Sequence, residues 1–207
     1  MHQRLTEILA YLAHVRADLA NIIETTPIEA LSFRPAPNES VSMQSTSNES
    51  VSLQSTTREA VSPTLAPRVW YGAQIVHHLG AVEGSTTKLL ERLFAEALAN
   101  DLPVDHAHNS LMHSLDHFNI TDRKARRVEA PERLQPPAEV SLVVAWESLQ
   151  RVRERTHRAV ATVDGRDLTR NAAPHPLFGP INGYEWVLII GQHEERHLHQ
   201  LRDTLKR

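Results

Sequence analysis

GYEWVLIIGQHEERHLHQLRDTLK, residues Gly183–Lys206, is the stretch that decides the fold. Its apolar start leads directly to two histidines, His193 and His197, that are four residues apart. On an α-helix, with about 100° of rotation per residue, this spacing places both side chains on one face. The same face carries three apolar residues: Trp186, Ile190 and Leu201. The pattern therefore predicts a helix that directs two imidazole rings into the interior of the protein.

Two buried imidazoles need hydrogen-bonding partners, because an unpaired ring nitrogen in an apolar interior is costly. A metal ion shared by His193 and His197 meets this need for both rings at once. The alternative is that both are core histidines bonded to the backbone or to each other. We take the metal site as the main interpretation, and the rest of the chain must supply further ligands.

Composition limits the classes of protein to which this chain can belong. Its 207 residues fit a single domain over 1–207, and a net charge of −3 gives no basic surface for nucleic acid or anionic lipid. No apolar run approaches the length of a membrane span. The chain has no cysteine, which excludes disulfides, thiolate metal sites and cysteine nucleophiles. We therefore expect a cytoplasmic protein without nucleic-acid or membrane partners.

Three further stretches have the apolar periodicity of amphipathic helices: His2–Thr25, Trp70–Ala99 and Pro137–Asp164. No segment has a convincing strand pattern. Four long helices predict an all-α four-helix bundle, a fold in which metal sites are built from side chains on facing helices. Asn182 and Glu185 have the spacing of a capping box at the start of the last helix.

A tandem repeat separates the first two predicted helices. It reads NESVSMQSTS and then NESVSLQSTT at residues 38–57, with a degraded third copy that ends at Pro67. Its richness in Ser, Thr, Asn and Gln predicts a long inserted loop over 38–67, or at most a small hairpin. A duplication tolerated in a surface loop is the simplest interpretation, and a lid over the site is the alternative.

The second predicted helix supplies a third histidine. His77 lies roughly 160° from the centre of its apolar stripe and His78 only roughly 65° away. We therefore expect His77 to face solvent and His78 to reach the interior. In a bundle, His78 can meet His193 and His197. Three neutral imidazoles with an open position are typical of a catalytic metal site that activates a bound water or thiol.

A rival pair, His113 and His117, has the same spacing as the pair on the last helix. Leu111, Leu115 and Phe118 lie on the opposite face, so the pattern directs these two histidines outward. An exposed pair lacks the buried surroundings of a dedicated metal site. We expect a solvated surface here.

Other polar residues lie close to the predicted site. Glu83, Glu194 and Gln200 are candidates for hydrogen bonds that orient the metal-binding rings. Arg16 and Arg153 lie on the inward stripes of their helices and could bind an anionic substrate or the carboxylates of a thiol cofactor. The alternative is that each arginine extends its head to water at an end of the bundle.

The order of these motifs resembles that of the DinB/YfiT-like superfamily of metal-binding four-helix bundles. The residues that carry the resemblance are Trp70, His78, Leu79 and Glu83 on the second helix, and His193, His197 and Gln200 on the last. The segments Phe33–Pro35 and His175–Gly179 are also similar to family patterns. The chain departs from the family in two places. Tyr71 stands where Ser is common, and the repeat enlarges the first loop, so substrate specificity does not transfer.

The resemblance implies a divalent ion, most often nickel or zinc, held by three histidines in an open-sided site. Members with an assigned activity are similar to thiol S-transferases and isomerases that use low-molecular-weight thiols, or to hydrolases. We therefore expect a metal-dependent enzyme of the thiol-dependent S-transferase type that acts on a small molecule. A metal-dependent hydrolase and a non-catalytic, metal-stabilised binding or stress-response bundle are the alternatives, and a homodimer is an option for the oligomeric state.

Overall fold

The computed structural model of the chain describes residues 1–32, 70–124 and 129–206. The elements reported below belong to one compact unit, Met1–Phe33 with Tyr71–Arg207. The decapeptide repeat and the loop predicted over 38–67 lie outside the described residues. Within the described ranges, no helix is both long enough and apolar enough to cross a membrane.

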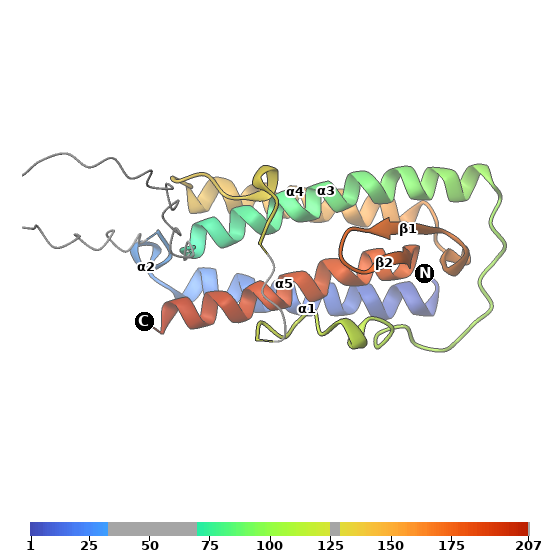
Figure 1. Cartoon of the computed structure of the whole chain (residues 1–207), viewed down its shortest axis with the longest axis horizontal. Coiled ribbons are helices and arrows are strands. Elements are labelled where there is room, and N and C mark those ends of the chain that lie inside the picture. The colour runs from blue at the N-terminus through green and yellow to red at the C-terminus, as the bar shows by residue number, and fades with distance from the viewer. Residues whose placement is uncertain (33–69, 125–128, 207) are drawn as a thin grey trace, which may run out of the picture. The chain divides into compact units, whose positions relative to one another are not determined.

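Four long helices form the unit (Figure 1): α1 (Gln3–Thr25), α3 (Gly72–Ala99), α4 (Leu142–Ala161) and α5 (Gly183–Leu205). Helix α3 packs along α4, and both α1 and α3 pack along α5. A short helix, α2 (Ile28–Ser32), follows α1. The all-α four-helix bundle predicted from the sequence is confirmed.

The helix predicted over 137–164 is shorter at both ends than expected. The Ser141 hydroxyl accepts a hydrogen bond from the Val144 amide and caps the start of α4. After Ala161 the chain continues as turns to Gly165, whose positive φ of 81° suits a residue without a Cβ. Helix propensity and apolar periodicity alone predict a helix that continues through such turns. The Ser141 cap marks where α4 begins, and the left-handed Gly165 marks the end of the turns that follow it.

A two-stranded hairpin precedes α5, so the expectation that the chain has no strand was wrong. Strand β1 (Ala172–His175) pairs antiparallel with β2 (Gly179–Asn182), and His175 stands opposite Gly179. Each strand has four residues and contains a proline, which is too short for an alternation of apolar and polar residues to be visible. The Trp186 indole donates to the Ala173 carbonyl at 3.2 Å and attaches the hairpin to α5.

Three short 3-10 helices lie in the connections: η1 (Asp116–Phe118), η2 (Glu132–Leu134) and η3 (Leu168–Arg170). The start of α5 is set by the capping box predicted from the sequence. The Asn182 side chain accepts from the Glu185 amide at 3.1 Å, and the Glu185 carboxylate accepts from the Asn182 amide at 2.8 Å. This reciprocal pair determines where α5 begins and therefore which of its faces points inward.

Helices α1 and α5 approach closely at Gly191. A Cβ built on Gly191 would lie 2.6 Å from Cε1 of Tyr11 and 2.8 Å from Cδ1 of Leu12. Both contacts are too short for carbon atoms, so a side chain here would force the two helices apart. The absence of a side chain at this position permits the helix contact.

Replacing Gly191 with alanine is expected to destabilise the protein by about 1–3 kcal/mol, the usual cost of overpacking a core. Urea unfolding of the purified variant measures this change. Gly84 is the matched control, because its built Cβ meets Val152 at an ordinary 3.7 Å. Gly84→Ala should be neutral or should stabilise helix α3 by up to about 1 kcal/mol. Equal stability of the two variants would contradict the close contact.

Candidate metal centre

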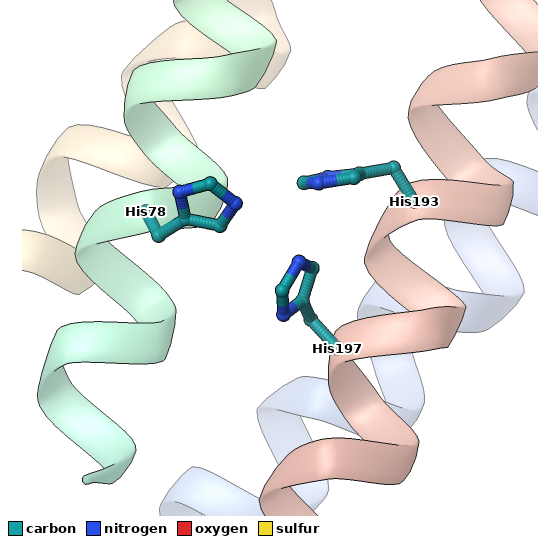
Figure 2. A group of neighbouring side chains, drawn as sticks. All are labelled: His78, His193 and His197. Atoms are coloured by element: carbon teal, nitrogen blue, oxygen red, sulfur yellow. The ribbon is translucent and has the colours of Figure 1, made fainter. Parts of the chain in front are cut away.

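Three histidines from two helices meet between α3 and α5 (Figure 2). His78 extends from α3, and His193 and His197 extend from α5 toward it. One ligand nitrogen from each ring lies within 4.8 Å of those of the other two. The ring centroids are 4.5 Å apart for the α5 pair, and 5.2 and 4.8 Å from His78 to His193 and His197. The structure thus brings together the three residues that the sequence predicted as ligands.

Hydrogen bonds determine which nitrogen two of the rings can offer. Nδ1 of His78 donates to the Leu134 carbonyl in η2 at 2.8 Å, and Nδ1 of His197 donates to the side-chain carbonyl of Gln200 at 2.8 Å. Because a carbonyl oxygen only accepts, each Nδ1 carries the proton of the neutral ring, and Nε2 is the acceptor nitrogen. This arrangement fixes the ring tautomer in many metal sites. Sequence reasoning had suggested Gln200 but gave no sign of Leu134, which contributes a backbone carbonyl.

Burial keeps the three rings in the form that binds metal. Burial, followed by the proximity of His197 and His78, lowers the pKa of His193 well below its usual value. Burial and the nearby His78 lower the pKa of His197 to about 3. Burial also lowers the pKa of His78, against the hydrogen bond to Leu134. All three imidazoles are therefore neutral near pH 7 and available to a cation.

The metal-free protein is expected to lose stability as the pH falls below about 6.5. The unfolded chain then protonates His197, whereas the folded chain, with a pKa of about 3, does not. This histidine alone makes the free energy of unfolding fall by about 1.4 kcal/mol per pH unit within that window. Urea unfolding at pH 7 and pH 5 measures the slope. His197→Gln should reduce the slope by about 1.4 kcal/mol per pH unit, leaving the contributions of His78 and His193, and the exposed-site control His113→Gln should not change it. A wild-type slope in His197→Gln would contradict the assignment.

The other histidines near these motifs are not part of the cluster. His77 is half-buried rather than solvent-facing as expected, and the group of three side chains that could hold a metal ion does not include it. His113 and His117 are exposed, as predicted, and His113 bonds to Asp116 at 2.8 Å. The rival pair therefore lies on the surface.

One residue from each long helix contributes to a buried network of four charges, Arg16, Glu83, Arg153 and Glu194, which we call the charge network. Arg16 donates to Glu194 at 2.6 Å and to Glu83 at 3.1 Å. Arg153 donates to Glu83 at 2.7 Å and to Glu194 at 2.6 Å. All four side chains are at most 9% exposed. Each carboxylate therefore bridges both guanidinium groups, and the charge network as a whole joins all four helices.

Further hydrogen bonds complete the charge network. Arg16 donates to the Gln150 side chain at 2.8 Å, and Arg153 donates to the Leu12 carbonyl at 3.1 Å. Burial alone would lower the pKa of Arg153, but the two carboxylates of the network outweigh it and raise that pKa. Two positive and two negative charges balance, so the network adds no net charge beside the histidines.

The charge network answers one question that the sequence left open for Arg16 and Arg153. Both guanidinium groups are buried, so the alternative in which they extend to water is wrong. Their carboxylate partners are Glu83 and Glu194, two of the three residues that we had considered as hydrogen-bond partners of the clustered histidines. The pairing depends on how four helices are aligned, which periodicity within each helix does not reveal.

A small cavity of about 60 Å³ adjoins His193. Its walls come from α3, β1 and α5, and they are mainly apolar. The lining residues are Leu79, Val82, Glu83, Thr86, His175, Trp186, Ile189, Ile190, His193 and Glu194. A water molecule needs roughly 10–15 Å³ measured in this way, so the space can hold a few small groups. The cavity gives a compact ligand room beside one of the three histidines.

Replacing Gln200 with leucine is expected to weaken metal binding about 10- to 100-fold, because the Nδ1 proton of His197 loses its acceptor. Gln200→Glu keeps an acceptor at that position and should stay much closer to the wild-type affinity. Competition with a chromophoric zinc chelator measures both values. If Gln200→Leu binds zinc as tightly as the wild type, the hydrogen bond does not orient the ring.

Comparisons with known proteins agree with this architecture. The chain is 27% identical over 138 residues to YuaE, an uncharacterized protein of Bacillus subtilis (strain 168). The matched region covers 65% of this chain and 76% of YuaE. The crystal structure of TT2238, a four-helix bundle protein, superposes with a TM-score of 0.53 at 20% identity. That match covers 96% of this chain and 98% of TT2238, and it shows the fold alone.

The family comparison extends over nearly the whole described bundle. The model of the DinB superfamily matches residues 11–201, a range that contains all three clustered histidines and all four residues of the charge network. A match over this much of the chain, together with the four-helix fold, identifies the family. The chain belongs to the DinB superfamily.

Proposed function

We propose that this protein is a divalent-metal-dependent enzyme that joins a low-molecular-weight thiol to a small electrophile, with nickel or zinc held by His78, His193 and His197. The observation that supports the proposal is the close approach of three neutral imidazoles, two of which have Nδ1 committed to carbonyl acceptors. Within the described part of the chain, this group of potential ligands contains three histidines and no carboxylate. Three protein ligands are the number found in catalytic rather than structural zinc sites.

A divalent ion in such a site, when bound, acts as a Lewis acid and lowers the pKa of a coordinated thiol or water. The residues around the site form the cavity wall and the charge network. The cavity beside His193 has mainly apolar walls, and the charge network pairs Glu83 and Glu194 with guanidinium groups. Each carboxylate is therefore already paired with both arginines.

The small volume of the cavity favours a second candidate, a non-catalytic bundle that the metal stabilises. About 60 Å³ is well below the 300–1,000 Å³ typical of ligand pockets. In this case metal removal lowers the melting temperature and no reaction occurs. A hydrolase needs the same three histidines, with water in place of the thiol.

One experiment separates these functions. The purified protein is loaded with zinc or nickel and assayed with low-molecular-weight thiols and chlorinated or epoxide electrophiles, and separately with activated esters in the absence of thiol. The S-transferase predicts turnover that requires both metal and thiol, and that is lost when His78, His193 and His197 are all alanine. Ester cleavage without thiol would support the hydrolase instead. Metal-dependent stability without turnover in either assay would support the non-catalytic bundle.

A further inference from the structure

A fourth histidine, His175, lines the cavity from the hairpin and has no role in the proposed metal site. It ends strand β1 and shares the cavity wall with His193. Its ring stacks on Phe178 at 4.5 Å with an interplanar angle of 13°, and its centroid lies 5.1 Å from that of Trp186. These aromatic contacts hold the His175 ring in place at the edge of the cavity.

The backbone fixes His175 in the tautomer opposite to that of two clustered histidines. The Leu177 amide donates to Nδ1 of His175 at 3.2 Å, so Nδ1 is an acceptor and the neutral ring carries its proton on Nε2. His78 and His197 instead carry the proton on Nδ1. Burial lowers the pKa of His175, which agrees with a neutral ring near pH 7.

This tautomer makes His175 a hydrogen-bond donor rather than a metal ligand. It is absent from the group of side chains whose ligand atoms approach within 4.8 Å, and no residue in the described ranges accepts a hydrogen bond from its Nε2. Apart from Thr86 and the clustered His193, the other polar groups in the lining are Glu83 and Glu194, and both are engaged in the charge network. The His175 ring lines the cavity, and its N–H is not taken up by another described residue.

We propose, building on the proposed function, that His175 binds the substrate by donating from Nε2 to an oxygen of a small carbonyl or carboxylate compound. The lining favours a substrate with an apolar body and one oxygen acceptor. The N–H of His175 can form a hydrogen bond to an oxygen, and the aliphatic side chains make favourable contacts with carbon atoms. The volume of about 60 Å³ restricts the part that enters to a few non-hydrogen atoms. His175 thus determines which electrophile is held beside the clustered histidines.

Acetate serves as the probe for the oxygen acceptor. The protein is loaded with Co²⁺, whose visible spectrum reports ligands near the ion, and is titrated with acetate. His175→Phe keeps an aromatic ring against Phe178 but removes the donor, and we expect it to bind acetate at least about tenfold more weakly than the wild type. His175→Gln places an amide N–H near the position of Nε2 and should stay within about threefold. Equal acetate affinities in all three proteins overturn the inference.

Two further readouts keep this inference distinguishable from the proposed function. Failure of the wild type to bind Co²⁺ overturns the proposed function and the substrate role of His175 with it, whereas a Co²⁺-loaded wild type with equal acetate affinities overturns only His175. Both variants should retain the wild-type Co²⁺ content, since His175 is not a ligand. In the metal-free protein, long-range ¹H–¹⁵N correlation spectra should show His175 protonated on Nε2. A proton on Nδ1 removes the donor and overturns the inference without any metal.

Discussion

Alanine at His78, His193 and His197 together is expected to reduce bound zinc or nickel from about one ion per chain to background. Among the described residues, the fold brings one potential ligand nitrogen of each ring within 4.8 Å of the other two, and alanine supplies no replacement. Metal content is measured by elemental analysis after loading and dialysis. Circular dichroism of the triple variant shows whether it remains folded, so that loss of metal is distinguished from unfolding.

The exposed pair provides the control for this loss. His113→Ala combined with His117→Ala removes two histidines with the same sequence spacing, but both lie on the surface. This variant should keep the wild-type metal content. Equal, near-zero metal in the wild type and in the triple variant would remove the basis for a metal centre, and loss of metal from the surface variant would place the site elsewhere.

Replacing Arg153 with methionine is expected to destabilise the protein by about 3–5 kcal/mol, the usual cost of removing one partner from a buried ion pair. Arg153 is 7% exposed and donates to both Glu83 and Glu194. Without it, two buried carboxylates share the single guanidinium of Arg16, and one negative charge is left uncompensated. Urea unfolding at pH 7 measures the change in the free energy of unfolding.

Two controls show whether the uncompensated charge causes this effect. Adding Glu83→Gln to Arg153→Met leaves one positive and one negative charge, so the double variant should be more stable than Arg153→Met alone. Arg151→Met breaks an exposed pair with Glu147 on the same helix and should change stability by less than about 1 kcal/mol. If Glu83→Gln destabilises the Arg153→Met protein as much as it destabilises the wild type, the charges do not interact as described.

Helix phase explains why the histidine cluster was predictable. The spacing of His193 and His197 and the angle of His78 from its apolar stripe depend only on the 3.6-residue period, which each helix keeps along its length. His77 shows the limit of the same argument. It lies on the outer side by angle, yet it is half-buried, and the period of one helix does not show what else packs against it.

Contacts that depend on the assembled tertiary structure were not predictable from the sequence. Arg16, Glu83, Arg153 and Glu194 were all singled out, but their mutual pairing requires the relative height of four helices. The Leu134 carbonyl that orients His78 belongs to the backbone, and any residue type can supply it. The hairpin that carries His175 has strands of four residues, too short to show a period. The charge network and the hydrogen bond from His78 to Leu134 each combine segments that are far apart in the chain, whereas the hairpin is local but too short to show a pattern.

X-ray absorption spectroscopy at the metal K-edge tests the central claim most directly, because it counts the imidazole ligands around the bound ion. The wild type loaded with zinc or nickel should show three imidazole rings per metal from His78, His193 and His197, with the remaining positions filled by light atoms from solvent. His197→Ala should show one ring fewer, or no bound metal. A wild-type spectrum with at most one imidazole, or a spectrum that is unchanged in His197→Ala, would contradict the three-histidine centre.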